Sequence, residues 1–382
     1  MDRTPLEAAE RAAAATEPRV HGEAIVYRFY DVGYGTRLDA VADLLAASSP
    51  ERARPVRGQA HAIQIPNPPV TVGLGTESVT VGGEAREAEF SARVFDFGVI
   101  SLRARLAARP CLPWGEFAAF GAAVAAAPGW AAAFQRVRER LLARILQAID
   151  RPGESPVTED YVVFRVHRLE DASGSRLPAE ALRDGDVARL LAGEPRALAP
   201  ATQRELLAQR FSYFEDDLAV ITWNAALVVE PAPEDTDVQY VLEFANAQLL
   251  ELRFEDAALD AEIPKVYTRI AEARRGFLLL GTRFSRLLAQ LQRRVADTTE
   301  MVERVENSLK VTDDVFLARI YAAALEVFRG GTWRRGIDRK IAILRDSYGM
   351  LEAESQARRS EMLEAVIVVL IVFEIVLSLL RR

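Results

Sequence analysis

The residues able to do acid–base, metal or nucleophilic chemistry are few in this sequence. It contains three histidines, His21, His61 and His167, and one cysteine, Cys111. No two histidines are spaced so that one face of a helix or strand would present both to a metal ion. Cys111 lies between prolines at 110 and 113 with no adjacent base, as is typical of a small apolar residue in a loop. The sequence therefore predicts no metal site, no cofactor and no catalytic residue.

Two glycine pairs and two aspartates are the remaining candidates for a site. The segments VGYG at 32–35 and GLGT at 73–76 lack the third glycine and the helix register of a dinucleotide-binding loop, so they predict turns. Asp96 and Asp217 begin two similar segments, DFGVISL and DLAVITW, and the second ends in Trp223. Matching positions at the start of matching strands favour turn or capping roles over a catalytic pair of carboxylates. The sequence therefore predicts a protein that is not an enzyme.

From residue 22 to residue 260 the sequence pattern predicts strands that alternate with helices, and these elements would position the residues discussed above. Because 96–102 and 217–223 are similar and lie in the same strand-then-helix order, we predict a duplicated α/β unit, built as two equivalent sheets or as one sheet from two halves. The units span 22–150 and 151–260, divided by the turn-rich segment RPGESP, and follow a flexible tail at 1–21. Strand signals lie at 24–29, 70–83, 92–106, 161–169 and 217–223, and helix signals at 114–126, 130–149 and 235–250.

Helical periodicity dominates the chain after Pro264. Apolar or small residues recur there in alternating steps of four and three, the spacing of a coiled-coil seam. A second helix follows Thr312, and a third begins near Thr332 after two glycines. We therefore predict an antiparallel helical hairpin, a coiled-coil stalk, over 261–361. Its first seam consists of Val266, Ile270, Ala273, Phe277, Leu280, Phe284, Leu287 and Leu291.

The end of the chain has the composition of a membrane span. The segment at 363–380, LEAVIVVLIVFEIVLSLL, carries only two charged side chains, Glu364 and Glu374. At a rise of ~1.5 Å per residue it covers about 27 Å, enough for a thin hydrocarbon core. Arginines precede and follow it, so charge does not decide its orientation. We therefore predict one C-terminal transmembrane helix at 362–382, in preference to a helix buried in a protein core.

Glu374 lies near the middle of this predicted span. An ionised carboxylate costs on the order of 3 kcal/mol at that depth, so it would be paired with a neighbouring helix or protonated against lipid. The chain offers no second span, so a neighbour would come from another copy or from another membrane protein. We therefore predict Glu374 and Glu364 as intramembrane assembly positions, and a homo-oligomer.

A basic arm lies within the predicted stalk, with eight basic residues and one acid between 265 and 294. It would contact anionic lipid headgroups or structured RNA, or be a solvated face paired with acids of the globular part. A net charge of -7 disfavours a general nucleic-acid binder. The arm consists of Lys265, Arg269, Arg274, Arg275, Arg283, Arg286, Arg293 and Arg294.

The composition also bears on location. The first twenty residues contain no apolar run typical of a secretory signal, and a lone cysteine suits a reducing compartment. Lysine is rare among the basic residues and alanine is abundant, as in high-GC bacterial genes. We therefore predict a single-pass protein of the bacterial inner (cytoplasmic) membrane, with its globular part in the cytoplasm.

Three stretches of the chain resemble a known family: YFEDDLAVITWN at 213–224, the helical region at 309–348, and the apolar ending with its two glutamates. Together they resemble the required-for-meiotic-nuclear-division family, also called the Sad-interacting-factor family, a domain of unknown function. The resemblance covers roughly residue 160 to the end. It implies a membrane-anchored, self-associating, non-catalytic protein, and mitochondrial members of that family support organellar translation at the inner membrane.

These observations predict an α+β protein that acts as a membrane-anchored scaffold or tether and self-associates through its stalk and span. The alternative is an oligomeric ion-channel-like assembly that resembles the divalent-metal channels. The segment YGM at 348–350 resembles part of their filter motif, but the asparagine that follows it there is missing here, and this chain has one predicted span where those channels have two. A hydrolase has no nucleophile motif to support it.

Overall fold

The structure is a computed structural model, and it divides into two compact units that are described separately below. Unit 1 comprises Met1–Phe254 and Arg304–Gly331, and unit 2 comprises Glu255–Glu303 and Thr332–Arg382. The residues that the structure describes are 17–48, 56–57, 63–64, 67–153, 155–231, 237–275, 289, 292–293, 295–303, 310–311 and 315–380.

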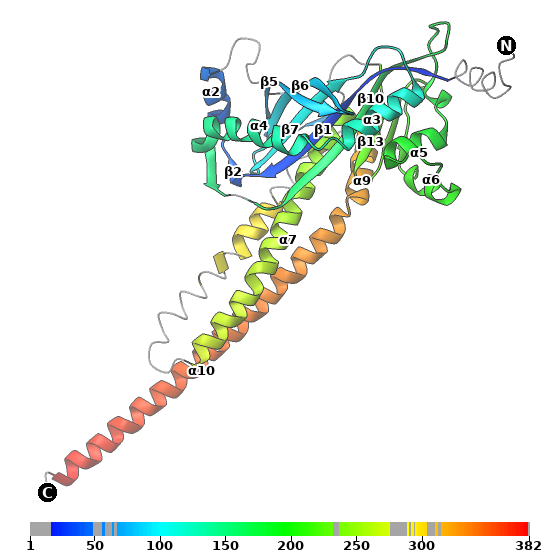
Figure 1. Cartoon of the computed structure of the whole chain (residues 1–382). Coiled ribbons are helices and arrows are strands. Elements are labelled where there is room, and N and C mark those ends of the chain that lie inside the picture. The colour runs from blue at the N-terminus through cyan, green and yellow to red at the C-terminus, as the bar shows by residue number, and fades with distance from the viewer. Residues whose placement is uncertain are drawn as a thin grey trace. The chain divides into compact units, whose positions relative to one another are not determined.

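Unit 1 is built on one large mixed sheet (Figure 1). The long strands β1 and β10 lie side by side at its centre and run antiparallel, whereas β10 and β13 are parallel. In spatial order the sheet contains β11 (Arg210–Phe211), β12 (Leu218–Ile221), β13 (Ala225–Val229), β10 (Thr158–Glu170), β1 (Arg19–Asp31), β7 (Val99–Ala107), β6 (Glu84–Val94), β5 (Val70–Val81) and β3 (Val56–Arg57), and β8 (Leu112–Pro113) also pairs with β1. Two short ladders join β2 (Gly33–Thr36) to β9 (Ile149–Pro152) and β4 (Ile63–Gln64) to β14 (Lys310–Val311).

Helices lie on both faces of this sheet, and α7 and α10 extend from unit 1 into unit 2. The helices within unit 1 are α2 (Leu38–Ser48), α3 (Trp114–Ala125), α4 (Trp130–Ile145), α5 (Asp184–Ala192), α6 (Pro200–Leu206) and α9 (Val315–Val327), with short 3-10 turns η2 (Leu146–Ala148) and η3 (Ala179–Ala181). The two long helices are α7 (Asp237–Arg275) and α10 (Gly330–Leu380).

Alternation along β1 divides the core of unit 1 between the two faces of the sheet. Ala24, Val26 and Tyr30 belong to the apolar cluster that also contains Trp114 of α3 and Phe134 of α4. Successive side chains of a strand point to opposite faces, so Tyr27 and Phe29 lie on the other face. Both are buried there. Strand β1 therefore buries apolar side chains on both faces of the sheet.

The second face is covered by the first part of α7 and by the segment that follows α9. Phe244 of α7 packs its ring against Phe95 and Phe97, at centroid distances of 5.5 and 5.9 Å. Phe328 packs edge-on against Tyr161 of β10 at 5.5 Å. Because α7 is enclosed in this way, nearly all of its residues from 238 to 252 are buried, charged and amide side chains included.

In unit 2, the last part of α7 packs against α10. Leu259 and Val266 of α7 and Ile337 and Leu344 of α10 are buried. Lys340 lies 2.7 Å from Asp256 and 2.6 Å from an oxygen of Asp260. This partly buried lysine links two carboxylates one helical turn apart.

The molecule is α+β as predicted, but the predicted duplicated unit is wrong. Strands from 22–150 and from 151–260 form one sheet, which is one of the two arrangements expected, but the two halves are not equivalent in it, because the two similar segments have different surroundings. Residues 99–102 belong to β7, which pairs with β1 and β6, whereas 218–221 form β12, which pairs with β11 and β13. The similarity reflects the apolar pattern that any central strand carries.

The predicted coiled-coil stalk is also wrong. The pattern predicts a helix that starts at Pro264, but Pro264 lies inside α7, which begins at Asp237 and whose first half belongs to the core of unit 1. Of the predicted seam, Val266 is buried and Ile270 half-buried, and the positions from 277 to 291 lie outside the described residues. No coiled-coil stalk is present in the part of the chain that the structure describes.

The prediction of a C-terminal transmembrane helix is overturned as well. Among the residues described, no single helix has both the length and the apolar composition needed to cross a bilayer. Two glutamates interrupt the apolar residues at the end of α10, and the uninterrupted run between them, 365–373, is nine residues, or about 14 Å, compared with a hydrocarbon core of ~30 Å. Two consecutive helices, Trp114–Ala125 and Trp130–Ala148, are long and apolar enough only when taken together, and they are bent by 61° relative to each other. Both contribute residues to the apolar core of unit 1.

Candidate functional site

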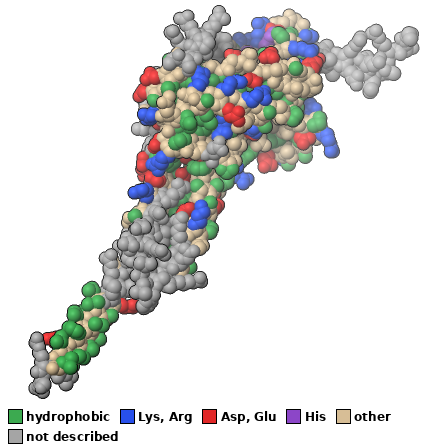
Figure 2. Space-filling model, turned by 60° about the vertical axis from the view of Figure 1, so that its left-hand side comes forward, with side chains coloured by type: hydrophobic (Ala, Val, Ile, Leu, Met, Phe, Trp, Pro, Cys, Tyr) green, Lys and Arg blue, Asp and Glu red, His purple; other side chains and the backbone are tan. Residues whose placement is uncertain are grey.

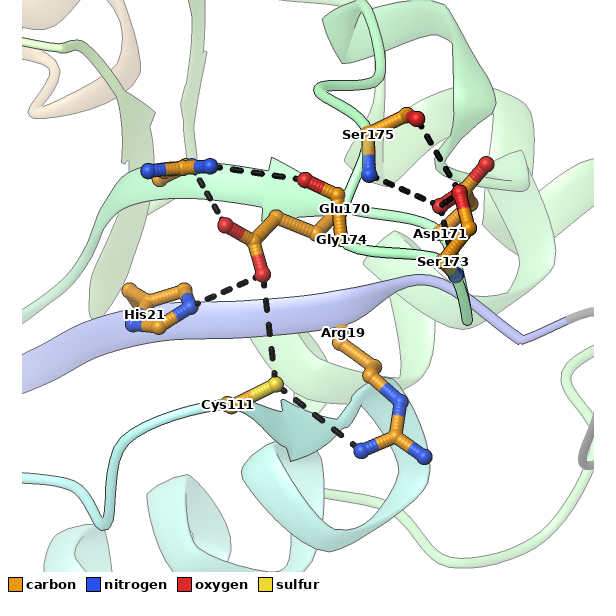
Figure 3. A network of polar contacts seen from close by, with 9 residues as sticks. Arg19, His21, Cys111, Glu170, Asp171, Ser173, Gly174 and Ser175 are labelled. Carbon is orange, nitrogen blue, oxygen red and sulfur yellow. Dashed lines mark hydrogen bonds and ion pairs between the residues drawn. The ribbon is translucent and has the colours of Figure 1, made fainter.

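Three side chains that are far apart in the sequence meet near the start of β1: His21 on β1, Cys111 just before β8, and Glu170 at the end of β10 (Figure 3). His21 Nε2 lies 3.3 Å from Glu170 Oε2, and Cys111 Sγ lies 4.0 Å from the same oxygen. The three ligand atoms all lie within 4.8 Å of one another. Glu170 is buried, whereas His21 and Cys111 are partly exposed, so the cluster is reached from solvent.

A β-bulge positions His21. In the ladder between β1 and β10, His21 pairs with Arg168 but Gly22 pairs with Val166, so the register shifts between these two residues of β1. An extra residue in one strand changes the direction of the side chains beside it, and bulges are frequent next to functional sites. The bulge requires Gly22, since a Cβ there would lie 2.4 Å from the carbonyl oxygen of Arg165.

Replacing Gly22 by alanine should therefore destabilise the protein and disturb the cluster beside it. The methyl group meets backbone, which cannot move aside like a flexible side chain, and we expect a loss of roughly 2 kcal/mol in the free energy of unfolding. Urea denaturation followed by circular dichroism measures it. Gly153→Ala is the matched control, since nothing lies within 4 Å of a Cβ at Gly153. Equal stability of the two variants would contradict this account of the bulge.

Cys111 occupies a strained backbone position. Its φ is 60°, in the left-handed region that non-glycine residues rarely adopt. The next two residues are held by pairing with β1, Leu112 to Val20 and Pro113 to Arg19. The Arg19 guanidinium donates to Cys111 Sγ at 3.8 Å. Such strain costs of order 1–3 kcal/mol, persists where the surroundings enforce it, and clusters at functional sites.

The two oxygens of Glu170 have different partners. Oε1 lies 2.5 Å from Arg168 Nε, whereas Oε2 faces His21 and Cys111. The hairpin after Glu170 is fixed by Asp171, which accepts hydrogen bonds from the Ser173 hydroxyl and from the N–H groups of Ser173 and Ser175. The Ser173 hydroxyl bond is the main cause that holds the pKa of Asp171 below its usual value. The carboxylate of Glu170 is thus fixed on one side and faces the cluster on the other.

A second polar cluster, on the other side of Gly22, surrounds Glu23. Its carboxylate lies 2.6 Å from Arg105, 3.4 Å from the fully buried Arg165 and 3.5 Å from His167. Burial alone would raise the pKa of Glu23, but hydrogen bonds from His167 and Arg105 outweigh it and lower the pKa to about 2. This cluster is a charged link between β1, β7 and β10, so its role is structural.

The two glutamates predicted as assembly positions, Glu364 and Glu374, lie on α10 and are exposed. The apolar residues around them, 363–377, are exposed too, and Figure 2 shows hydrophobic side chains along this end of the helix. This exposed part of α10 is called the apolar end below.

The basic arm is only partly described. Lys265 lies 3.5 Å from Glu262, one turn earlier in α7, which fits a solvated helix face. Arg269, Arg274 and Arg275 belong to α7, and Arg293 is exposed. Arg283, Arg286 and Arg294 lie outside the described residues.

Asp96 and Asp217 lie in two separate turns. Asp96 is in the turn between β6 and β7, where its carboxylate accepts from Asn67 at 2.9 Å. Asp217 precedes β12 and accepts from the backbone N–H of Tyr213 at 2.7 Å. Trp223, 40% exposed, follows β12 and has its ring against Phe328. The positions are structural.

Sequence reasoning missed the cluster of His21, Cys111 and Glu170. Only two local signals pointed to it: a glycine directly after a histidine in a strand, and a cysteine within a proline-flanked turn. Neither signal shows that the two residues meet, and nothing local marks Glu170. The prediction of no metal site considered only residues close in sequence, whereas His21, Cys111 and Glu170 come together through strand pairing.

Comparison with known proteins places the cluster inside a family domain. The family described as "Uncharacterized protein MJ0711, N-terminal domain" matches residues 21–236, which include all three cluster residues. The chain is also 21% identical over 245 residues to the uncharacterized protein MJ0711 of Methanocaldococcus jannaschii, an alignment that covers 64% of this chain and 73% of that protein. No solved structure matches. The resemblance to the required-for-meiotic-nuclear-division family stays a prediction. The chain belongs to the family of the MJ0711 N-terminal domain.

Proposed function

We propose that the protein is a non-catalytic scaffold or tether, and that copies of the chain associate through the apolar end of α10. The observation that carries this proposal is the exposure of 363–377. Thirteen of these fifteen residues are apolar, the exceptions being Glu364 and Glu374. The large apolar side chains in this range are between 38% and 66% exposed.

Such a surface is costly in water. Each Å² of apolar surface removed from water contributes roughly 25 cal/mol, and contiguous exposed apolar patches of several hundred Å² mark interaction sites. The residues from 365 to 373 are apolar without interruption, so every side of the helix is apolar. One neighbouring helix covers one side only, which favours several neighbours over one.

A second copy of the same chain is the occupant that these features favour. In copies related by rotational symmetry, the apolar segments have the same length and lie at the same position along the symmetry axis. The apolar ends can therefore cover one another without a different partner protein. The glutamates limit how the segments pack, because a carboxylate enclosed between apolar helices must be solvated or hydrogen-bonded. We therefore place Glu374 at the rim of the contact.

Sedimentation of the full-length chain tests the proposal. The wild type should sediment as an assembly larger than a dimer, and the double variant Val368→Glu with Ile371→Glu as a 42.2 kDa monomer. The control Ala342→Glu with Asp346→Glu alters two exposed positions of α10 outside the apolar end and should sediment like the wild type. A wild type that stays monomeric, or that binds neutral lipid vesicles as a monomer, would contradict self-association.

No observation among the described residues favours the alternative, an ion-channel-like assembly. Gly349 and Met350, from the segment that resembles a filter motif, are helical residues of α10. A filter built from backbone carbonyls needs carbonyl groups that are free of helical hydrogen bonds. Scaffolding is therefore the function proposed.

A further inference from the structure

We infer that His21, Cys111 and Glu170 form a binding site for a divalent transition-metal ion of the zinc class. The site is independent of the apolar end of α10 and of the self-association proposed for it. It rests on the identity of the donor atoms, on their separations, on the partners of Glu170 and on the backbone of Cys111.

The separations of the donor atoms are close to those that a tetrahedral ion requires. Zinc binds imidazole nitrogen and carboxylate oxygen at ~2.0–2.2 Å and thiolate sulfur at ~2.3 Å, so two ligands of one ion lie about 3.3–3.7 Å apart. The distance from His21 Nε2 to Glu170 Oε2 is 3.3 Å, and that from Cys111 Sγ to the same oxygen is 4.0 Å. All three donor atoms lie within 4.8 Å of one another, so a bound ion would draw Cys111 Sγ closer to the other two.

The donor set selects the class of metal. Magnesium and calcium prefer oxygen ligands throughout, whereas a thiolate with an imidazole favours zinc and its first-row neighbours. Three protein ligands leave one tetrahedral position for water or a small ligand. The partial exposure of His21 and Cys111 gives the ion a path from solvent.

The partners of Glu170 fit a ligand role. Arg168 binds Oε1, which leaves Oε2 directed at the cluster. Residues that hydrogen-bond the outer atoms of a ligand orient it and are part of most metal sites. Arg19, by contrast, lies 3.8 Å from Cys111 Sγ and would repel a cation. The metal-loaded site therefore requires the Arg19 side chain to turn away, which its exposed position allows.

The backbone of Cys111 argues against a merely structural cysteine. Glycine at a φ of 60° would be free of the strain that cysteine bears there. A structural contact made by a small apolar side chain gives no reason for this strain. A role as a metal ligand explains the strain, because the strained turn before β8 brings Cys111 Sγ next to Glu170.

Cobalt(II) is the probe for the test, added alone to the reduced, tag-free full-length chain. One equivalent should bind and give the near-ultraviolet thiolate-to-cobalt charge-transfer band and the visible bands of a tetrahedral site, and zinc should displace it. His21→Gln and Glu170→Gln should each weaken binding about tenfold or more, and Cys111→Ser should abolish the charge-transfer band. Arg19→Gln should tighten binding.

Two further variants separate metal binding from folding. Cys111→Gly should abolish the charge-transfer band while raising the thermal stability of the metal-free protein, because it relieves the backbone strain. His167→Gln changes a histidine of the Glu23 cluster and should leave the cobalt spectrum unchanged. An octahedral spectrum without a charge-transfer band, or binding that survives in all three ligand variants, would overturn the inference.

Discussion

Replacing Glu23 by glutamine should lower the free energy of unfolding by about 3 kcal/mol at neutral pH. A carboxyl whose pKa falls from 4.5 to about 2 on folding favours the folded state by that amount once it is ionised. The amide keeps the size of the side chain but not its charge, so Arg165, fully buried, loses a carboxylate 3.4 Å away. Removing one partner of a buried ion pair is among the most destabilising single changes.

The pH dependence of stability gives this prediction a second measurement. Because the folded pKa lies below the unfolded one, the contribution is fully present above pH ~4.5 and is lost as pH falls towards 2. Urea denaturation of the wild type should show this fall, and Glu23→Gln should flatten it. Glu180→Gln, at an exposed position, is the control and should behave like the wild type. Parallel pH profiles for wild type and Glu23→Gln would show that Glu23 is not the group responsible.

Replacing Phe244 by alanine should cost about 3–5 kcal/mol, the usual effect of removing a fully buried ring. Phe244 joins α7 to the sheet through Phe95 and Phe97, and Tyr240 stacks on it one turn earlier, at a centroid distance of 6.5 Å. The cavity would lie between two rigid elements that cannot close it. The first part of α7 should therefore lose protection in hydrogen exchange before the strands do.

The same substitution at Phe214 is the matched control for Phe244→Ala. Phe214 is also in unit 1 and also packs against an aromatic ring, that of Tyr213, but it is 64% exposed. Its loss should cost below about 1 kcal/mol, because little apolar surface returns to water. If both alanine variants unfolded at the same urea concentration, α7 would not be part of the core.

Local elements were predicted well wherever the pattern alone decides the structure. The helices expected at 114–126 and 130–149 are α3 and α4, with ends displaced by at most a few residues. The expected single strand at 92–106 is instead β6 and β7, because Gly98 adopts a φ of 87° in a tight turn. A strand signal and a hairpin with a short apolar turn look alike in sequence.

The bounds and surroundings of the two long helices were predicted wrongly, because a buried helix can carry polar residues that are typical of an exposed one. The first half of α7 carries glutamate, glutamine and asparagine at buried positions, and Glu243 is paired there with Arg93 of β6. The helix expected at 235–250 is the first part of α7, but Pro264 predicted the start of a separate helix at a position where α7 continues. The apolar residues at the end of α10 predicted a span in which the two glutamates would be assembly positions, whereas no single helix among those described is both long and apolar enough to cross a bilayer.

The candidate site was beyond local reasoning for a different reason. Its three residues come from β1, the turn before β8 and the end of β10, and only the sheet order brings them together. A single sequence gives residue types and spacing but not which strands are neighbours. Knowing that β1 pairs with both β8 and β10 is enough to find the cluster.

The central position of β1 also governs when this fold can form during synthesis. Among the described strands, β1 leaves the ribosome well before its partner β10, where Glu170 meets Arg19 about 150 residues later in the chain. Contacts of such long sequence separation form slowly, and an unpaired apolar strand is prone to aggregation. Until residue 170 has emerged, β1 lacks one neighbour, and His21 and Cys111 lack the third member of their cluster. An unpaired β1 is exposed to aggregation during this interval, and the proposed metal site can be completed only after β10 has paired with β1.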